Sequence, residues 1–368
     1  MPFRVEPPYR HDQADRVGVL LVNLGTPDAP TASALRRYLA QFLSDPRVVE
    51  IPALLWKVIL HGVILRVRPA KSAAKYASVW MPEGSPLLVW TRRQATLLQG
   101  YLGERGAQVR VVPAMRYGNP SVDSALDALR AEGVTRVLVL PAYPQYSGAT
   151  TASAFDAVAA WGLRARRLPE LRFVNEYHDD PAYIEALAQS VRRHWSQEGR
   201  GDVLVMSFHG MPERTLHLGD PYHCQCHKTA RLLAQALALA PSDYRVTFQS
   251  RFGKAKWLEP ATEPTLVALA TAGTQRVDVI CPGFSADCLE TLEEIDQEAR
   301  EAFLQAGGKA FHYIPCLNDT HEGMAALSQV ALQHLAGWPV QPRPDDGEGP
   351  LKERSDRQAR ARALGAER

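Results

Sequence analysis

Two parts of the chain carry residues that can move protons or hold a metal ion, and His209 marks the first. It follows an apolar run, residues 203–208, and precedes Gly210 and Pro212, which turn the chain. An imidazole at the end of a buried strand can act as a general base near neutral pH or as a ligand of a borderline metal ion. A ring that merely hydrogen-bonds its own loop is the alternative, and this segment alone leaves both open.

The second part is a row of carboxylates after the apolar run of residues 276–281. On an α-helix the row spans an arc of about 80°, and its members are Asp287, Glu290, Glu294, Glu298 and Glu301. Like charges four residues apart repel each other, and no basic residue is interleaved along the row. A cation or a flux of protons would relieve that repulsion, whereas a solvated acidic face is the common alternative.

Basic and aromatic side chains gather after other apolar runs. The group in the first half is Arg116 and Tyr117, and the group in the second half is Arg251, Lys254, Lys256 and Trp257. A flat aromatic acid would use such groups, the indole ring for stacking and the cations for its carboxylates. Ordinary surface charge beside a core tryptophan is the alternative.

Two further segments are weaker candidates for binding. Residues 144–153 (PQYSGATTAS) offer hydroxyl and N–H groups, including Ser147, that could hold a carboxylate or simply cap a helix. Residues 223–227 (HCQCH) contain metal-binding side chains, but their C-x-C spacing differs from that of a structural zinc site, so we expect a surface loop. The chain has no dinucleotide or triphosphate fingerprint, which disfavours a nucleotide enzyme.

These residues need a scaffold, and the hydrophobic pattern predicts one. Six apolar runs are typical of buried parallel strands: residues 17–23, 109–113, 136–141, 203–208, 245–248 and 276–281. Amphipathic segments such as residues 121–132 and 182–197 lie between them. The alternation predicts an α/β fold with doubly wound parallel sheets.

The two halves of the chain are similar to each other. Arg116-Tyr117-Gly118 in one half corresponds to Arg251-Phe252-Gly253 in the other. We therefore predict two similar Rossmann-like domains with the active site in the cleft between them. The expected divisions are a flexible N-terminus (residues 1–16), an N-terminal domain (17–160), a C-terminal domain (161–335) and a polar tail (336–368) that is disordered or weakly helical.

Charge, hydropathy and cysteine content exclude several classes of protein. The 368 residues include 42 Lys+Arg and 40 Asp+Glu, a net charge of +2, so no global field attracts nucleic acid. No apolar run reaches the roughly 18 residues of a membrane span, although the stretch from Leu54 to Leu65 could lie on a membrane surface. The N-terminus lacks the pattern of a secretory signal and the five cysteines fit a reducing compartment, so we expect a cytoplasmic protein.

Seven segments of the chain, taken in order, resemble the ferrochelatases. They are VNLGTPDAP (22–30), MRYGNP (115–120), PQYSGATTAS (144–153), SFHGMPERT (207–215), GDPYHCQC (219–226), QSRFGKAKWLEP (249–260) and CPGFSADCLETLEEI (281–295). Members of that family insert ferrous iron into protoporphyrin IX, the last step of haem synthesis, between two Rossmann-like domains. The resemblance implies the same fold here, and the activity of a metal chelatase, a lyase.

The resemblance also implies roles for particular residues. It assigns catalysis to His209, Glu290 and Glu294, and metal binding to the first two. It assigns the wall of the porphyrin pocket to Tyr76, Ser85, Arg116, Tyr117, Ser147 and Trp257. A neutral His209 would accept the pyrrole protons, while the acidic row passes protons outward or metal inward, and the sequence leaves both directions of traffic open. Cys288 occupies a position that is histidine in many members, so that side chain has no assigned role.

Cofactors and partners follow from the same resemblance. Fe(II) is expected as a substrate, with no prosthetic group. A [2Fe-2S] cluster is not expected, because Gly148 stands where cluster-bearing members have a cysteine and no cysteine follows Cys316. Expected partners are protoporphyrin IX, iron and an upstream oxidase of the haem pathway, and no nucleic acid. The alternatives are a coproporphyrin III ferrochelatase, a sirohydrochlorin cobaltochelatase, or a porphyrin or haem carrier that performs no chemistry.

Overall fold

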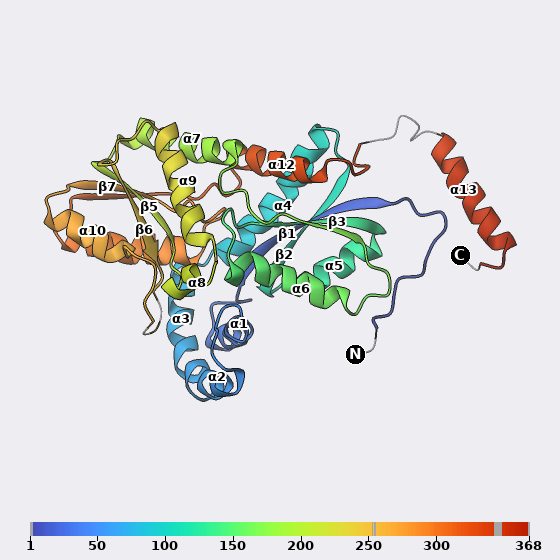
Figure 1. Ribbon diagram of the computed structural model, residues 1–368, viewed down its shortest axis with the longest axis horizontal. Coiled ribbons are helices and arrows are strands. Elements are labelled where there is room, and N and C mark those ends of the chain that lie inside the picture. The colour runs from blue at the N-terminus through green and yellow to red at the C-terminus, as the bar shows by residue number, and fades with distance from the viewer. Residues whose placement is uncertain (1–2, 252, 254, 342–347, 367–368) are drawn as a thin grey trace.

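The computed structural model describes residues 3–251, 253, 255–341 and 348–366. Two four-stranded parallel sheets follow each other along the long axis of the molecule, with helices on both faces (Figure 1). Their strand orders are equivalent, β2-β1-β3-β4 in the first sheet and β6-β5-β7-β8 in the second. This arrangement confirms the predicted α/β fold with two similar halves.

The first sheet contains β1 (Arg16–Thr26), β2 (Val109–Gly118), β3 (Val134–Pro141) and β4 (Glu170–Phe173). Its central strand is apolar because helices cover both faces, and Val19, Leu20 and Leu21 are fully buried. Strand β4 pairs in parallel with β3. The first half therefore extends beyond residue 160, where we expected it to end, because the short mixed sequence ELRF carries no strand pattern.

The second sheet contains β5 (Val203–His209), β6 (Tyr244–Gln249), β7 (Arg276–Ile280) and β8 (Ala310–Ile314). Its edge strand β6 ends in the same way as β2. The N–H of Phe248 donates to the carbonyl oxygen of Pro260 at 2.9 Å, and the N–H of Met115 donates to that of Pro120 at 2.7 Å. The similarity between the halves is thus one of backbone structure as well as of sequence.

Helices form a shared layer on one side of both sheets and separate layers on the other. The shared layer consists of α4 (Pro86–Glu104), α7 (Pro181–Glu198), α9 (Tyr222–Ala236) and α12 (His321–Leu335), and its core contains residues of both halves. Opposite it lie α5 (Val122–Ala131) and α6 (Ser153–Gly162) on the first sheet, and α10 (Thr262–Thr271), the π-helical η3 (Glu290–Ala299) and α11 (Arg300–Gln305) on the second. Helix α12 follows the second sheet in the chain but packs against α4 and α7, so it binds the two halves together.

Side-chain caps determine where several of these helices begin. Ser85 accepts a hydrogen bond from the N–H of Leu88 at the start of α4, and Ser121 accepts one from Ser124 at the start of α5. Asp180 does the same for α7, where proline occupies the next position. Each cap satisfies an N–H group that has no partner within its own helix.

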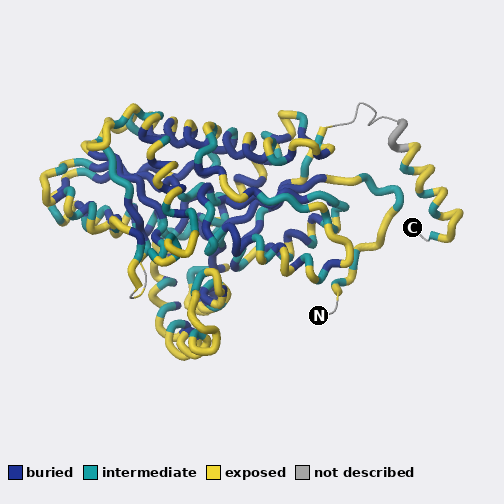
Figure 2. The backbone as a smooth tube through the Cα atoms, viewed as in Figure 1, coloured by how far each residue is buried: buried dark blue, intermediate teal, exposed yellow. Residues whose placement is uncertain are grey.

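A lobe of helices projects from the body near the place where the two halves meet (Figure 1). It consists of α1 (Ala32–Leu43), α2 (Ala53–Ile59), the π-helical η1 (Leu60–Ile64) and α3 (Leu65–Val79). The outer part of the lobe, around α2, is almost entirely exposed (Figure 2). Within the described part of the chain, no helix combines the length and the apolar character needed to cross a bilayer.

Both terminal segments make side-chain contacts with other parts of the chain. Near the N-terminus, Arg4 and Glu6 form ion pairs with side chains of α5, and the flexibility expected of residues 1–16 stays a prediction. The tail forms helix α13 (Glu348–Ala363), and its Arg357 donates hydrogen bonds to backbone carbonyl oxygens of the N-terminal segment. Residues 342–347, which the prediction of a disordered tail includes, lie outside the described residues.

Candidate active site

A cavity lies between the two halves at the carboxyl ends of strands β1, β3, β5 and β7. Its empty space is about 810 Å³, the open mouth included. The cavity wall consists of Asn23, Leu24, Gly25, Thr26, Tyr76, Ser85, Pro86, Leu87, Ala142, Tyr143, Gln145, Thr150, His209, Tyr222, Gly283, Phe284, Ser285, Ala286, Cys288, Leu289 and Glu290. Ligands of open α/β sheets bind at this end of the strands, as the sequence led us to expect.

His209 stands in the cavity wall as the last residue of β5. The next residue holds the turn in place, because the N–H of Gly210 donates to the carbonyl oxygen of Gln249 at 2.6 Å. A Cβ atom at Gly210 would lie 2.5 Å from that oxygen, which only glycine avoids. The Nδ1 atom of His209 is 2.6 Å from the carbonyl oxygen of Gly210. A carbonyl oxygen only accepts, so Nδ1 carries the proton and Nε2 presents a lone pair.

Glu290 enters the same wall from the first turn of η3. The helix is anchored to the neighbouring strand, since Nε2 of Gln249 donates to the carbonyl oxygen of Glu290 at 2.8 Å. Residues 290–299 are π-helical, with hydrogen bonds over five residues instead of four, and such turns are frequent at functional sites. The structure therefore brings His209 and Glu290, which are 81 positions apart in the sequence, to one cavity.

Glu294 lies outside the cavity wall and is held by Ser250, the residue directly after β6. Its carboxylate accepts hydrogen bonds from the N–H of Ser250 at 2.6 Å and from the hydroxyl of Ser250 at 2.5 Å. Burial raises the pKa of Glu294 above its ordinary value, and the hydrogen bonds from Ser250 and the nearby His209 only partly oppose that rise. A carboxyl of this kind can take up and release a proton at higher pH than an exposed one.

The predicted single row of five carboxylates on one α-helix is wrong, because Asp287 precedes the helix and residues 290–299 are π-helical. Asp287 is buried and accepts hydrogen bonds from Asn318 and Tyr313, so it supports the fold. Glu293 and Glu298, five residues apart, face the same way and both pair with Lys75 of α3. Lys75, from the other half of the chain, thus compensates part of the repulsion between the carboxylates of this helix.

The residues expected to line a porphyrin pocket divide into two groups. Tyr76 and Ser85 lie in the cavity wall, and both are buried. Ser147 caps the π-helical η2 (Gly148–Ala152) and contacts Asp220, outside the wall. Trp257 packs against the turn after His209, where its ring would lie 3.1 Å from a Cβ atom at Gly210.

Arg116 and Tyr117 are not among the residues of this cavity wall. Both donate hydrogen bonds to Asp45, Arg116 at 2.6 Å and the hydroxyl of Tyr117 at 2.7 Å. Burial by itself would raise the pKa of Asp45, but hydrogen bonds from Ser153, Tyr117 and others lower it below its ordinary value. The side chains are committed to this buried network, and their contact with a porphyrin stays a prediction.

Comparisons with known proteins identify the family. The family model described as Ferrochelatase matches residues 16–335. The chain belongs to the ferrochelatase family. A ferrochelatase of Methylibium petroleiphilum is 70% identical over 345 residues, covering 94% of this chain and 95% of that protein. A ferrochelatase of a Polaromonas species is 64% identical over 372 residues and covers all of both chains.

One solved structure supports the fold. It is described as SirB from Bacillus subtilis with Fe3+, and it matches with a TM-score of 0.51 at 10% identity, over 87% of this chain and 96% of its own. Family membership confirms the resemblance inferred from the seven sequence segments and places the chain among metal chelatases. It does not favour the carrier or the two other chelatases that we kept as alternatives.

This ferrochelatase has cavity residues that the sequence did not single out. Tyr143 follows β3 and directly precedes the segment 144–153 that we regarded as a weak candidate, and Gln145 lies within that segment. The hydroxyl of Tyr143 is buried and has no hydrogen-bond partner among the described residues. The only sequence signal for it is its position directly after a buried strand.

The Cys- and His-rich run of the ferrochelatase is helical, whereas we expected a loop. Residues 223–227 form the first turns of α9, and the rings of His223 and His227 lie 4.5 Å apart against Phe248. Cys226 is buried beneath them and Cys224 is exposed. Among the described residues, this run is not part of any group of three side chains that could hold a metal ion. Lys254, one of the basic residues expected near Trp257, lies outside the described residues.

Proposed function

We propose that this ferrochelatase inserts Fe(II) into protoporphyrin IX, with His209 as the base that accepts the pyrrole protons. A planar porphyrin must be distorted, deprotonated and met by a dehydrated metal ion before it is metallated. The observation that carries the proposal is the cavity in which the lone pair of His209 Nε2 and the carboxylate of Glu290 share one wall. Binding energy from the periphery of the ring would drive its distortion toward the transition state.

The acidic groups behind the cavity support a role in proton transfer. Glu290 lies in the wall, Glu294 lies outside it with a pKa raised by burial, and Glu293 of the same helix pairs with Lys75. After each reaction His209 must pass its proton to another group before it can act as a base again. A carboxyl with a raised pKa can accept and release such a proton near neutral pH. We infer that Glu290, Glu294 and Glu293 carry protons outward, and that His209 and Glu290 contact the incoming metal.

The composition of the cavity wall favours protoporphyrin over its more acidic relatives. The wall, as described, contains neither lysine nor arginine. Coproporphyrin III and sirohydrochlorin carry more carboxylates than the two of protoporphyrin and would need more cations around them. An apolar wall with few polar groups suits a ring whose edge is mostly hydrocarbon.

The experiment is anaerobic incubation of the purified protein with protoporphyrin IX and Fe(II), followed by absorbance, with coproporphyrin III and sirohydrochlorin in parallel. His209→Ala is expected to abolish metal insertion while porphyrin binding, followed by fluorescence quenching, stays nearly unchanged. His217→Ala, which alters an exposed histidine of helix α8 (Glu213–His217), is the matched control. Equal loss of binding and insertion would contradict the catalytic role, and binding without insertion in the unaltered protein would favour a carrier.

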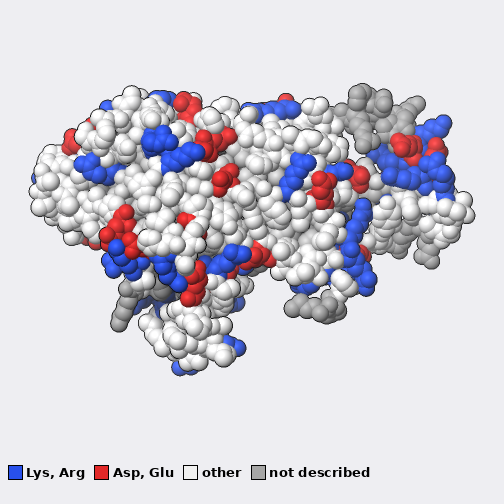
Figure 3. Space-filling view, in the orientation of Figure 1, with Lys and Arg blue, Asp and Glu red and all other residues white. Residues whose placement is uncertain are grey.

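We propose in addition that the projecting lobe contacts an anionic membrane surface. Its outer helix exposes large apolar side chains, with Leu54 85% and Val58 71% exposed. The chain has no acidic residue between Glu50 and Glu83, while Lys57, Arg66 and Lys71 are exposed there. Figure 3 shows the lobe as a mostly uncharged surface with basic side chains at its margins. Apolar side chains flanked by cations suit the interface of a bilayer containing anionic lipid.

Co-sedimentation with vesicles tests this contact. Binding is expected with vesicles containing phosphatidylserine and not with pure phosphatidylcholine, and the double variant Leu54→Glu/Val58→Glu is expected to abolish it. Leu163→Glu, at an equally exposed leucine on the body, is the matched control. Binding that survives the double variant would overturn the proposal. An upstream oxidase as partner, a cytoplasmic location and the lack of a prosthetic group stay predictions.

A further inference from the structure

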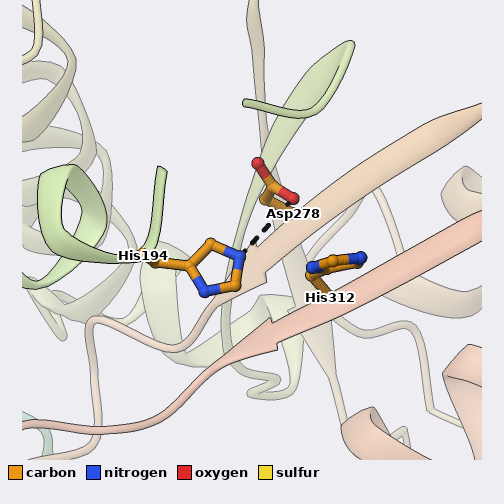
Figure 4. Close-up of side chains that lie close together, drawn as sticks. All are labelled: His194, Asp278 and His312. Carbon is orange, nitrogen blue, oxygen red and sulfur yellow. Dashed lines mark ion pairs between the residues drawn. The ribbon is translucent and has the colours of Figure 1, made fainter. Parts of the chain in front are cut away.

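A second group of metal-binding side chains lies away from the cavity, on the second sheet. His194 of α7, Asp278 of β7 and His312 of β8 converge there (Figure 4). Asp278 and His312 are directly paired across the two parallel strands, so their side chains project from the same face of the sheet. Helix α7 brings His194 to the same point. Asp278 and His312 occupy the middle of two short strands, RVDVI and AFHYI, whose other residues are mostly apolar, and such a position needs an explanation.

The three side chains present ligand atoms to one another. One potential ligand atom from each residue lies within 4.8 Å of the other two. The Nε2 atom of His194 is buried without a hydrogen-bond partner among the described residues, and it faces Oδ1 of Asp278 at 3.8 Å. An imidazole nitrogen with no hydrogen-bond partner can offer its lone pair to a metal ion.

The carboxylate of Asp278 is oriented by two donors from outside the group. Its Oδ2 atom accepts hydrogen bonds from Nε1 of Trp195 at 2.7 Å and from the N–H of Gly201 at 2.7 Å. These bonds hold Oδ2 away from the histidines and leave Oδ1 turned toward them. Outer partners of this kind orient the ligands of established metal sites.

Arg276 supplies the positive charge that faces this group in the structure. Its guanidinium lies 3.3 Å from Oδ1 of Asp278 and 3.4 Å from Nδ1 of His312. The same guanidinium donates at 2.7 and 2.5 Å to the carbonyl oxygens of Glu198 and Gly199. The short bonds go to the carbonyl oxygens at the end of α7, and the long contacts go to Asp278 and His312. Arg276 can therefore keep its bonds to α7 while it gives up its contacts with Asp278 and His312. An arginine only donates, so Nδ1 of His312 presents its lone pair.

We propose that His194, Asp278 and His312 bind a borderline divalent cation of the Zn²⁺ or Co²⁺ type, in exchange for the contacts of Arg276. Two imidazoles and one carboxylate form a ligand set that such ions favour, with water in the fourth position. Ligands around tetrahedral zinc lie about 3.3 Å apart, so rotation of the two imidazole rings closes the group. The bound ion ties α7 to β7 and β8, and it stabilises the folded chain in proportion to its concentration.

Titration with Zn²⁺ and Co²⁺ tests the proposal in a chain carrying His209→Ala and His223→Ala, which removes two other candidate ligands. One equivalent of Zn²⁺ is expected to bind and to raise the melting temperature, and Co²⁺ is expected to give the visible absorption of nitrogen coordination. His194→Ala and His312→Ala should each weaken binding by about 100-fold or more, since direct ligands count for at least as much as outer partners. His334→Ala, at a half-buried histidine outside the group, is the matched control.

Two further variants distinguish a metal site from a purely structural network. Trp195→Phe keeps all three ligands but removes a donor to Asp278, and it should weaken Zn²⁺ binding by about tenfold. Arg276→Gln removes the competing cation and should tighten binding by about tenfold, which a structural role for the group would not produce. Zn²⁺ binding that is unchanged in His194→Ala, His312→Ala and Trp195→Phe would overturn the proposal. If the alanine variants fail to fold, the opposite effects of Trp195→Phe and Arg276→Gln decide it.

Discussion

Lys75 of α3 contacts the buried carboxylate of Glu293 in η3 at 2.9 Å, and this ion pair joins the two halves of the molecule beside the cavity. Tyr76, which follows Lys75, and Glu290, in the first turn of η3, belong to the cavity wall. The pair therefore ties α3 to η3 beside the cavity. Burial raises the pKa of Glu293, while Lys75 opposes the rise.

Lys75→Met should make the stability of the protein fall more steeply as pH rises. Glu293 has a higher pKa in the folded than in the unfolded state, so the folded state binds its proton more tightly and loses stability as pH rises from the unfolded toward the folded value. Without Lys75, the pKa of Glu293 in the folded state rises further. We expect a loss of about 1 kcal/mol at pH 7, because Lys75 is itself partly exposed, and a much smaller loss near pH 4. Urea unfolding at pH 7 and at pH 4 measures the free energy of unfolding, with Lys71→Met as control. Equal losses of stability at the two pH values would contradict a role for the ionisation of Glu293.

Asp45→Asn should destabilise the first half with the opposite dependence on pH. The pKa of Asp45 is lowered in the folded state, so its contribution is present above the unfolded pKa and is lost as pH falls through the folded value. We expect a loss of about 2 kcal/mol at pH 7, since Arg116 and Tyr117 lose a charged acceptor. Asp156→Asn, which breaks an exposed pair with Arg47, should cost less than about 1 kcal/mol. A loss that persists unchanged at low pH would show that the charge of Asp45 is not what matters.

Glu290→Gln and Glu294→Gln should affect the reaction differently. Glutamine keeps the shape of the side chain but cannot take up a proton, so Glu290→Gln is expected to lower the kcat of metal insertion by about 100-fold with an unchanged KM for porphyrin. Glu294→Gln should alter mainly the dependence of kcat on pH. Burial raises the pKa of Glu294, so in the unaltered protein the activity should fall on the acidic side at a pH above the usual range of glutamate, and this fall should be absent from the variant. Glu301→Gln, at an exposed residue of α11, is the control. Identical profiles for Glu294→Gln and the unaltered protein would exclude this carboxyl from proton transfer.

Tyr143→Phe should weaken the binding of porphyrin without lowering the stability of the folded protein. The hydroxyl of Tyr143 is buried in the cavity wall without a partner among the described residues, so its removal should leave the free energy of unfolding unchanged or raise it by up to about 1 kcal/mol. If the hydroxyl serves the ligand, the Kd for protoporphyrin increases by about fivefold, measured by fluorescence quenching. Tyr177→Phe removes another buried, unpartnered hydroxyl outside this cavity and should leave that Kd unchanged. A similar Kd for all three proteins would exclude a contact between Tyr143 and porphyrin.

The sequence by itself determined the fold class and the position of the site. Apolar runs such as residues 17–23 and 203–208 indicate buried parallel strands, because only such strands are apolar on both faces. Chain direction then decides that residues directly after these runs, including His209, lie at one edge of a sheet. The similarity of the two halves placed the cavity between them.

Only the tertiary structure decided features that depend on contacts between distant residues. The π-helical form of η3 lets Glu293 and Glu298, five residues apart, pair with the same Lys75, and a row drawn on an ideal α-helix cannot show this. Lys75 reaches the acidic residues from more than 200 positions away, and Asp45 withdraws Arg116 into a buried network. Pairing across β7 and β8 brings Asp278 to His312. Local patterns determine which segments form strands and helices, whereas packing across the chain determines which charged side chains meet.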